Sequence, residues 1–302
     1  MRVFRQIEET LPTSLCLGFF DGVHEGHKVV IKNAVNLAHQ NNLKSAVLTF
    51  VDHPLCYLQN RTPSYIVTCE DRLQMIESMG VDYIFLLEFD EEIADLMAYD
   101  YLKEVLIEML HPRFITTGFN HRFGANRQGD ADMLKAYQDI FRYKFFEIPP
   151  ITYKNTLISS TKIRQLISEG KLENIKNLLG CDFYIKSKVK KGNKIGRTLS
   201  YPTANLDYPK DIVKLARGVY AGYVEADGKN HRAVINYGIR PTVSNTKDML
   251  VEAYLLDYSG DLYNKNVKVT FKEKIRDEKK FASLVDLKSQ IEKDVETANK
   301  II

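Results

Sequence analysis

The hydrophobic periodicity of the chain changes near residue 182, and this change limits the folds available to it. Across residues 15–148, short apolar runs alternate with segments of helical spacing, which is typical of βαβ units. Across residues 183–271, apolar and polar residues instead tend to alternate, with turn signals between the segments. A chain of 302 residues is long enough for about two domains, which we expect at 1–182 and 183–302.

The first region predicts a Rossmann-like α/β domain. Strands that alternate with helices form a parallel sheet with helices on both faces, because each helix returns the chain across the sheet. Helical spacing is clearest at residues 26–40, 71–79 and 96–110. Two shorter helical patterns, at 161–169 and 172–179, are each followed by a glycine, as helix C-termini often are.

The second region predicts an antiparallel sheet or barrel followed by one helix. Its β-rich segments are separated by Asp-Gly and Ser-Gly pairs, which favour turns between neighbouring strands. Residues 279–300 then have the apolar spacing of one amphipathic helix. The apolar residues with this spacing are Phe281, Leu284, Leu287, Ile291 and Val295.

Composition disfavours several other classes of protein. The chain has 42 Lys and Arg against 39 Asp and Glu, and a net charge of +3 is too small for a general nucleic-acid or membrane-surface binder. The cysteines are far apart and form no C-x-x-C pair, which predicts reduced and mostly buried thiols. They are Cys16, Cys56, Cys69 and Cys181. Because we find no signal-peptide pattern and no apolar stretch of membrane length, the expected location is the cytoplasm.

The segment from Gly18 to His27 is the first candidate site. It follows the first predicted strand and opens the first predicted helix, whose N-terminus offers unpaired N–H groups to an anion. His24 and His27, three residues apart, would point toward the same phosphate, while Gly22 and Gly26 let the backbone approach it closely. A capped turn with two surface histidines is the alternative for a motif this short.

Two further segments are rich in hydrogen-bond donors. Residues 158–164 place Ser160 and Thr161 at a predicted helix N-terminus, with two cations in its first turn, and so predict a second anion site. Residues 118–129 follow another predicted strand and include Asn120. A simple helix cap and a glycine-containing surface loop are the respective alternatives.

The order of these segments, with Thr49–Pro54 between the first and the last two, resembles the adenylyltransferase half of the bacterial bifunctional riboflavin kinase/FMN adenylyltransferases, also called FAD synthetases. The resemblance implies that the H-x-G-H histidines, His24 and His27, hold the ATP phosphates together with the S-S-T-x-x-R segment. It also implies that Asn120 belongs to the flavin and nucleotide site.

Two places depart from that family. Val51 and Asp52 stand where the family usually has an acidic residue and a proline, and His121 stands where it usually has phenylalanine. The second departure bears on the flavin contacts of the 118–129 loop more than on the ATP site.

The chemistry of FMN adenylylation requires positioning rather than a base. The FMN phosphate is already ionised at neutral pH, so it attacks the ATP α-phosphorus directly and pyrophosphate departs. Histidine, serine and arginine donors suffice for this. Mg²⁺ bridging the phosphates is expected because the reacting groups carry several negative charges.

Residues 186–197 contain six cations and no acid, with glycines among them. Such a loop can wrap phosphates through side chains and backbone amides, whereas a solvated hairpin is the usual alternative. A flavin- or nucleotide-responsive nucleic-acid binder is a further alternative. It is disfavoured because no aromatic residue interrupts the run to stack on bases.

The segments from about Ser187 to Asp294 resemble, in order, the riboflavin kinase domain of the same enzymes, a six-stranded antiparallel barrel with a C-terminal helix. The resemblance implies that Thr203 and Asn205 bind Mg²⁺-ATP. It also implies that Glu252 takes a proton from the ribityl 5′-hydroxyl. An oxygen-rich pair suits a hard cation, and a carboxylate suits a nucleophile that arrives protonated.

Three kinase positions depart from the family, since Ser187, Ser200 and Tyr201 replace Gly, Gly and Phe. Replacing a glycine restricts the backbone wherever a positive φ is required. An enzyme with only the adenylyltransferase active, its barrel a scaffold or regulatory flavin-binding module, is therefore the main alternative. The favoured hypothesis is a two-step enzyme that converts riboflavin to FMN and FMN to FAD.

The predicted site residues fall into four groups. Catalytic roles are assigned to His24, His27, Arg164 and Glu252. ATP or phosphate contacts are assigned to Gly18, Phe19, Asp21, Gly26, Ser160, Thr161, Gly192 and Arg197. Flavin contacts are assigned to Asn120, Arg122 and Arg276, and metal contacts to Thr203 and Asn205. ATP is the expected co-substrate and Mg²⁺ the expected cofactor, with riboflavin, FMN and FAD as ligands and neither nucleic acid nor membrane as partner.

Overall fold

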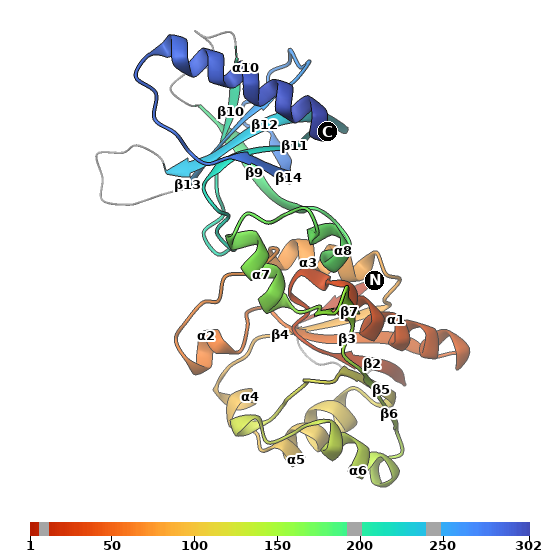
Figure 1. Ribbon diagram of the computed structural model, residues 1–302. Helices are drawn as coiled ribbons and strands as arrows, with labels where there is room; N and C mark the ends of the chain where they lie inside the picture. The colour runs from red at the N-terminus through yellow and green to blue at the C-terminus, as the bar shows by residue number, and fades with distance from the viewer. Residues whose placement is uncertain (6–11, 192–200, 240–248) are drawn as a thin grey trace. The chain divides into compact units, whose positions relative to one another are not determined.

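The computed structural model describes residues 1–5, 12–191, 201–239 and 249–302 (Figure 1). The chain divides into two compact units, Met1–Ser160 and Thr161–Ile302. The second unit includes α8 (Ile175–Leu179) and all but the first residue of α7 (Ser160–Ser168). The β-rich pattern begins after residue 182, where the sequence analysis placed the division. As a domain boundary, residue 182 stays a prediction.

A six-stranded parallel sheet forms the first unit, with the strand order β1-β4-β3-β2-β5-β6. Strand β2 is buried along its whole length, as a central strand covered on both faces must be. The strands are β1 (Arg2–Phe4), β2 (Thr13–Leu17), β3 (Lys44–Phe50), β4 (Tyr83–Leu87), β5 (Pro112–Gly118) and β6 (Lys144–Ile148), with a short hairpin of β7 (Thr152–Tyr153) and β8 (Thr156–Leu157).

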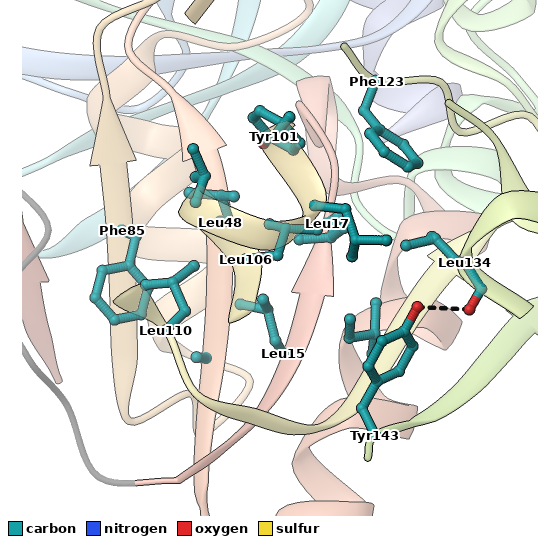
Figure 2. Packing of buried hydrophobic residues seen from close by; sticks show 14 of the residues in the cluster. Leu15, Leu17, Leu48, Phe85, Tyr101, Leu106, Leu110, Phe123, Leu134 and Tyr143 are labelled. Carbon is teal, nitrogen blue, oxygen red and sulfur yellow. Dashed lines mark hydrogen bonds between the residues drawn. The ribbon is translucent and has the colours of Figure 1, made fainter. Parts of the chain in front are cut away.

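Helices cover both faces of this sheet, as the sequence predicts. On one face, Leu15, Leu48 and Phe85 pack with a helical segment before β5 (Figure 2). On the other face, Cys16 and Val47 pack with α1. The helices are α1 (Glu25–Gln40), α2 (Leu55–Leu58), α3 (Cys69–Glu77), α4 (Glu91–Asp95), α5 (Ala98–Asp100) and α6 (Ala131–Phe141), with short 3₁₀ turns at Asp21–Val23 and Ala125–Arg127.

The helix predicted at 96–110 takes a different form. It consists of α5 followed by a π-helix at Tyr101–Met109. The wider turn of a π-helix aligns side chains about four to five residues apart, so that Tyr101, Leu106 and Leu110 all enter the core (Figure 2). The sequence pattern located the helical segment but not its pitch.

The prediction of mostly buried cysteines was wrong for three of the four. All four lie in the described residues and none forms a disulfide, but only Cys16 is buried. Cys16 lies inside the sheet, where burial raises the pKa of its thiol far above the ordinary range. The other three lie at helix and loop positions that keep partial contact with solvent.

The second unit contains a closed antiparallel barrel, which confirms the predicted architecture. Its strand order is β10-β13-β12-β11-β14-β9. Phe183, Tyr220 and Phe271 are fully buried in its interior, where the Phe271 ring contacts the rings of the other two. The strands are β9 (Phe183–Lys190), β10 (Thr203–Asp207), β11 (Gly218–Ala226), β12 (Lys229–Ile239), β13 (Met249–Leu255) and β14 (Asn266–Arg276).

Helix α10 (Leu284–Ile301) closes the chain against the outside of the barrel. Ala298 packs there with Val219 and Val234. The predicted apolar stripe is therefore only partly correct: Val295 joins this contact, but Leu284 is 59% exposed. Within the described residues, none of the helices combines the length and hydropathy that crossing a bilayer requires.

Candidate active sites

Three of the predicted segments follow strands that lie side by side in the first unit. Strands β3, β2 and β5 are neighbours and parallel, so their last residues, Phe50, Leu17 and Gly118, lie at one edge of the sheet. Ligands in open α/β sheets bind at this carboxyl edge. The segments that reach it are 18–27, 49–54 and 118–129.

The turn that follows β2 has an unusual backbone conformation. Phe20 and Val23 have φ values of 59° and 42°, and Gly22 has 77°. Side chains with a Cβ are strained in this left-handed region, at a cost on the order of 1–3 kcal/mol each. The turn is held partly from β3, where the Thr49 hydroxyl donates to the Phe19 carbonyl at 3.1 Å.

His24 and His27 form a stacked pair at the N-terminus of α1. Their rings are nearly parallel, with centroids 3.5 Å apart, and the rings of Phe20 and His27 meet in a T-shaped contact with centroids 5.3 Å apart. His24 caps the helix, because its Nδ1 accepts the His27 backbone N–H at 3.2 Å, which assigns its proton to Nε2. A Cβ on Gly26 would lie 3.2 Å from the His24 ring, so the glycine leaves room for that ring.

Asp21 holds this turn to the rest of the unit. Its buried carboxylate accepts the Ile66 backbone N–H at 2.9 Å, and its carbonyl accepts the Ser160 hydroxyl at 3.2 Å. The predicted phosphate contact of Asp21 stays a prediction. A direct contact would bring two anions together, the Asp21 carboxylate and the phosphate. The same bond places Ser160 against the first turn of the predicted site.

Phe19 is surrounded by groups from three segments. Its ring meets His53 edge-on at 4.8 Å and Tyr65 at 5.8 Å, and the Arg72 guanidinium carbon lies 4.1 Å from the ring centroid. The Tyr65 hydroxyl accepts the His53 N–H at 3.2 Å and donates to Asp52 at 3.4 Å, and burial raises its pKa, so it stays protonated. The sequence analysis assigned no role to Tyr65 or Arg72, because no local pattern distinguishes them.

The 118–129 loop has a fixed shape. Phe123 and Gly129 exchange backbone hydrogen bonds at 3.1 and 2.9 Å. Gly124 has a φ of 69°, and a Cβ there would come within 2.5 Å of the Ala98 Cα, so only glycine fits against α5. Asn120 lies exposed near the beginning of this loop.

Arg122, predicted to contact flavin, has a partner within its own loop. Its guanidinium lies 3.1 Å from the Asp130 carboxylate, which also caps α6 by accepting the Met133 N–H at 3.0 Å. This ion pair is partly exposed, so it contributes little to stability. The flavin contact of Arg122 remains a prediction.

His121 occupies the position where the family usually has phenylalanine. Its half-buried ring stacks on Phe123 at 6.0 Å, and its enclosed Nε2 has no hydrogen-bond partner among the described residues. Burial, and then the charge of Arg122, lower the pKa of His121 to about 4. His121 is therefore neutral near pH 7 and packs like the aromatic residue it replaces.

Thr161 and Arg164 lie on α7, which begins at Ser160. This confirms the predicted helix start at the S-S-T segment. The two residues belong to the second compact unit, whereas the histidine pair belongs to the first. Their phosphate contacts remain predictions.

In the second unit, the predicted kinase residues share one face of two paired strands. Asn205 on β10 is the register partner of Glu252 on β13, and Thr203 is the partner of Tyr254. Because side chains two residues apart on a strand point to the same side, Thr203, Asn205 and Glu252 lie on one face. Asn205 is only 7% exposed, and its amide nitrogen donates to the Thr203 carbonyl at 3.3 Å.

This face continues around the barrel through backbone pairing. Glu252 is also the register partner of Asn236 on β12, which pairs in turn with Val219 on β11. Val219 belongs to the apolar cluster under α10. Glu252 and Asn236 therefore lie on the helix-covered side of the barrel. The sequence analysis quoted Asn236 in a motif but gave it no role, because only strand register reveals its neighbour.

Arg276, predicted to contact flavin, is paired with α10. Its guanidinium donates to both oxygens of Asp294, at distances from 2.7 to 3.1 Å, and Asp294 is 2% exposed. Gln290 donates to the same carboxylate at 3.0 Å. The arrangement fastens the helix to β14, and the flavin contact of Arg276 stays a prediction.

Two of the three departures in the kinase region are described. Ser187 pairs with Val267 inside β9, and its backbone is not in the left-handed region, so a glycine's freedom is not needed there. Tyr201 packs edge-on against Tyr254 at 5.1 Å, and burial, with the charge of Glu292 on α10, raises the pKa of its hydroxyl, a group that phenylalanine lacks. Gly192, Arg197 and Ser200 lie outside the described residues.

The Thr203 and Asn205 side chains fit a hard divalent cation. The threonine supplies a hydroxyl oxygen and the asparagine an amide oxygen, both neutral donors of the kind that Mg²⁺ accepts. In the described part of the chain, no group of three or more His, Cys, Asp and Glu side chains is placed to hold a metal ion. A cation here would depend on nucleotide phosphates for its remaining ligands.

Comparisons with known proteins match a family to each of the two parts of the chain. The FAD synthetase family profile matches residues 6–162, and the riboflavin kinase profile matches residues 179–302. Two similar proteins carry the name bifunctional riboflavin kinase/FMN adenylyltransferase. The Haemophilus influenzae protein is 37% identical, with 94% of this chain and 92% of that one covered. The Escherichia coli K12 protein is 33% identical, with 95% and 91% covered.

A solved structure is similar along the whole chain. The crystal structure of a Streptococcus pneumoniae protein named macrolide-efflux protein has a TM-score of 0.90 and 30% sequence identity. The similarity covers 98% of each chain. Two compact units of these kinds thus recur together in another bacterial protein.

Proposed function

The chain belongs to the family of bifunctional riboflavin kinase/FMN adenylyltransferases, and on that premise we propose that it makes FAD from riboflavin in two ATP-dependent steps. The second unit phosphorylates riboflavin to FMN. The first unit transfers AMP from ATP to FMN, giving FAD and pyrophosphate.

The observation that carries the adenylyltransferase half is the histidine pair at the N-terminus of α1, beside the ends of β3, β2 and β5. A helix N-terminus and two imidazoles supply donors for an anion. In the reaction, an FMN phosphate oxygen bonds to the ATP α-phosphorus while the bond from that phosphorus to the bridging oxygen breaks. Pyrophosphate departs with the bridging oxygen, and the donors of this site stabilise its charge.

In the kinase half, Glu252 acts as the base. It accepts the proton of the ribityl 5′-hydroxyl as that oxygen bonds to the ATP γ-phosphorus, and ADP departs. Its register neighbours on the paired strands, Asn205 and Asn236, carry neutral amide side chains. The geometry supports a base at Glu252 because the predicted metal residues lie on the same face.

Mg²⁺ belongs to both reactions in this proposal. When bound with ATP it neutralises phosphate charge and thereby favours attack at phosphorus. In the barrel, Thr203 and Asn205 would hold it, and their oxygens orient the nucleotide relative to Glu252. The location of the protein in the cytoplasm remains a prediction.

Chromatography of flavins tests the proposal. The purified protein is incubated with Mg²⁺-ATP and, in separate reactions, riboflavin or FMN. FMN and FAD from riboflavin would support both activities. FAD from FMN with riboflavin unchanged would favour the adenylyltransferase-only alternative, with the barrel inactive or regulatory. The absence of product in both reactions would contradict the proposal.

A further inference from the structure

Arg72, on α3, is buried at the carboxyl edge of the parallel sheet. It is 2% exposed. Its guanidinium donates to the backbone carbonyls of Phe19 at 2.9 Å, Phe50 at 2.5 Å and Val51 at 3.1 Å. One side chain therefore joins the residues that follow β2 to those that end β3.

The charge of Arg72 is balanced in an unusual way. Among the described residues it forms no ion pair, and its partners are three carbonyl oxygens, the Cys69 sulfur at 3.4 Å and the Phe19 ring. A buried cation without a carboxylate pays a desolvation penalty that neutral oxygens offset only in part. Stability alone is therefore a poor explanation for an arginine at this position.

The segment that Arg72 holds leads directly to the histidine pair. Phe19 is fixed through its carbonyl and through its ring, and Phe20 follows in a strained left-handed conformation. Phe20 then packs against His27, which stacks on His24. Strained backbone persists only where its surroundings hold it, and Arg72 supplies two of the contacts on Phe19 that do so.

We propose that Arg72 is a positioning residue for FMN adenylylation. It fixes the Phe19 segment so that the strained turn holds His27 and His24 in their stacked arrangement, and it adds buried positive charge beneath the edge that receives phosphates. The inference rests on the proposed function of the first unit. Cationic attraction to phosphate is stronger from a site of low dielectric than from the surface.

Kinetics of two substitutions separate the two contributions. Arg72→Gln removes both the charge and the guanidinium fork, whereas Arg72→Lys keeps the charge and loses the fork. We expect Arg72→Gln to lower kcat for FAD formation from FMN about tenfold or more, since small displacements of catalytic groups have effects of this size. Arg72→Lys should recover the KM for ATP but not kcat. The exposed Arg113 on β5 is the matched control, and Arg113→Gln should change neither.

The riboflavin kinase rate of the same preparations is the internal reference. Wild-type kcat and KM for FAD formation in Arg72→Gln would overturn the inference. An equal loss of both activities together with a lower Tm would also overturn it, because that result indicates a purely structural role.

A measurement independent of activity completes the test. Ring-current shifts of the His27 ring protons report the stacking on His24 and the edge contact with Phe20. We expect Arg72→Gln to move these resonances toward random-coil values, and Arg113→Gln to leave them unchanged. Unchanged resonances in Arg72→Gln would refute positioning. If the wild-type protein formed no FAD from FMN, the proposed function would fail, and the resonances would still decide the role of Arg72.

Discussion

The histidine pair of the first unit and the Asn205–Glu252 pair of the barrel are held in place in different ways. The histidines sit on a strained turn that is fixed by hydrogen bonds to distant segments, from Ile66 to Asp21 of the turn and from Arg72 to Phe19. Asn205 and Glu252 are neighbours because antiparallel strands pair in one register. One site depends on side-chain hydrogen bonds, and the other depends on a backbone ladder.

This difference predicts different sensitivities. Strand register is maintained by many backbone hydrogen bonds, so a single side chain on the barrel face can be changed without moving its neighbours. A turn held by a few buried polar contacts loses its geometry when one of them is removed. Substitutions of residues that support the histidine pair should therefore lower the catalytic rate. Substitutions near the Asn205–Glu252 pair should lower it only when they disrupt the backbone hydrogen bonds between the strands.

The largest effect should come from Glu252→Gln. Removing the base should lower the rate of riboflavin phosphorylation about a thousandfold, within the range typical for general bases. FAD formation from FMN should be unchanged, because Glu252 and the histidine pair lie in different compact units. Measuring both rates on one preparation checks this, and unchanged riboflavin phosphorylation would remove Glu252 as the base.

Breaking the ladder itself should come next. A Cβ on Gly222 would lie 2.0 Å from the Thr270 carbonyl oxygen, so Gly222→Ala must push β11 away from β14. We expect a loss of about 3 kcal/mol in barrel stability, as for other overpacked positions, with reduced kinase activity. Urea unfolding followed by barrel tyrosine fluorescence measures this loss of stability.

Gly228→Ala is the control for changing a glycine, since nothing lies within 4 Å of a Cβ at its turn position, although its φ of 74° adds backbone strain. A smaller loss in Gly222→Ala than in Gly228→Ala would contradict the ladder argument.

His27→Ala should remove one of the proposed phosphate donors of the first unit. We expect FAD formation from FMN to fall about a hundredfold, as for other lost donors to developing charge, with riboflavin phosphorylation intact. The assay is the same pair of rates. Equal loss of both would point to global damage or to a wrong assignment of activities to the units.

The smallest effect concerns pH and His121. Its pKa is about 4 in the folded protein and about 6.5 when unfolded, so below pH 6.5 the unfolded chain binds a proton that the folded chain does not. Folding stability should therefore fall as the pH drops from 6.5 toward 4, and the loss from this residue should reach about 2 kcal/mol at pH 5.

His121→Phe isolates this contribution. The variant should lose less stability between pH 8 and pH 5 than the wild type, by the amount expected for His121, as measured by urea unfolding of both proteins at each pH. Parallel curves would show that His121 titrates normally in the folded state.

Much of the fold could be predicted because periodicity is local. The βαβ alternation, the β-rich region and the helix at 161–169 all appeared as expected, since the spacing of apolar residues records which face is buried. The helix at 96–110 kept its place but became partly a π-helix, because pitch depends on how Tyr101 and Leu106 meet the sheet. Leu284 shows the same limit, since an apolar residue at the correct spacing is buried only where the helix meets the barrel.

The candidate sites divide in the same way. His24 and His27 were predicted with their helix N-terminus, because the motif and the strand-to-helix transition are neighbours in sequence. Arg122 and Arg276 were chosen as donors in motifs, but their carboxylate partners, Asp130 and Asp294, were invisible until the chain folded. A cationic residue in a motif predicts where positive charge lies in the sequence, but it does not predict which group pairs with that charge in the folded protein.

The sequence by itself determined the two kinds of unit, the family and the segments that hold the candidate chemistry, because motifs and periodicity are properties of neighbouring residues. Tertiary structure alone decided that Arg72 supports the turn before the histidine pair, and that Asn236 is the register partner of Glu252. Both relations join residues far apart in the chain. They follow from which strands lie side by side, and that outcome reflects packing of the whole unit rather than any local preference.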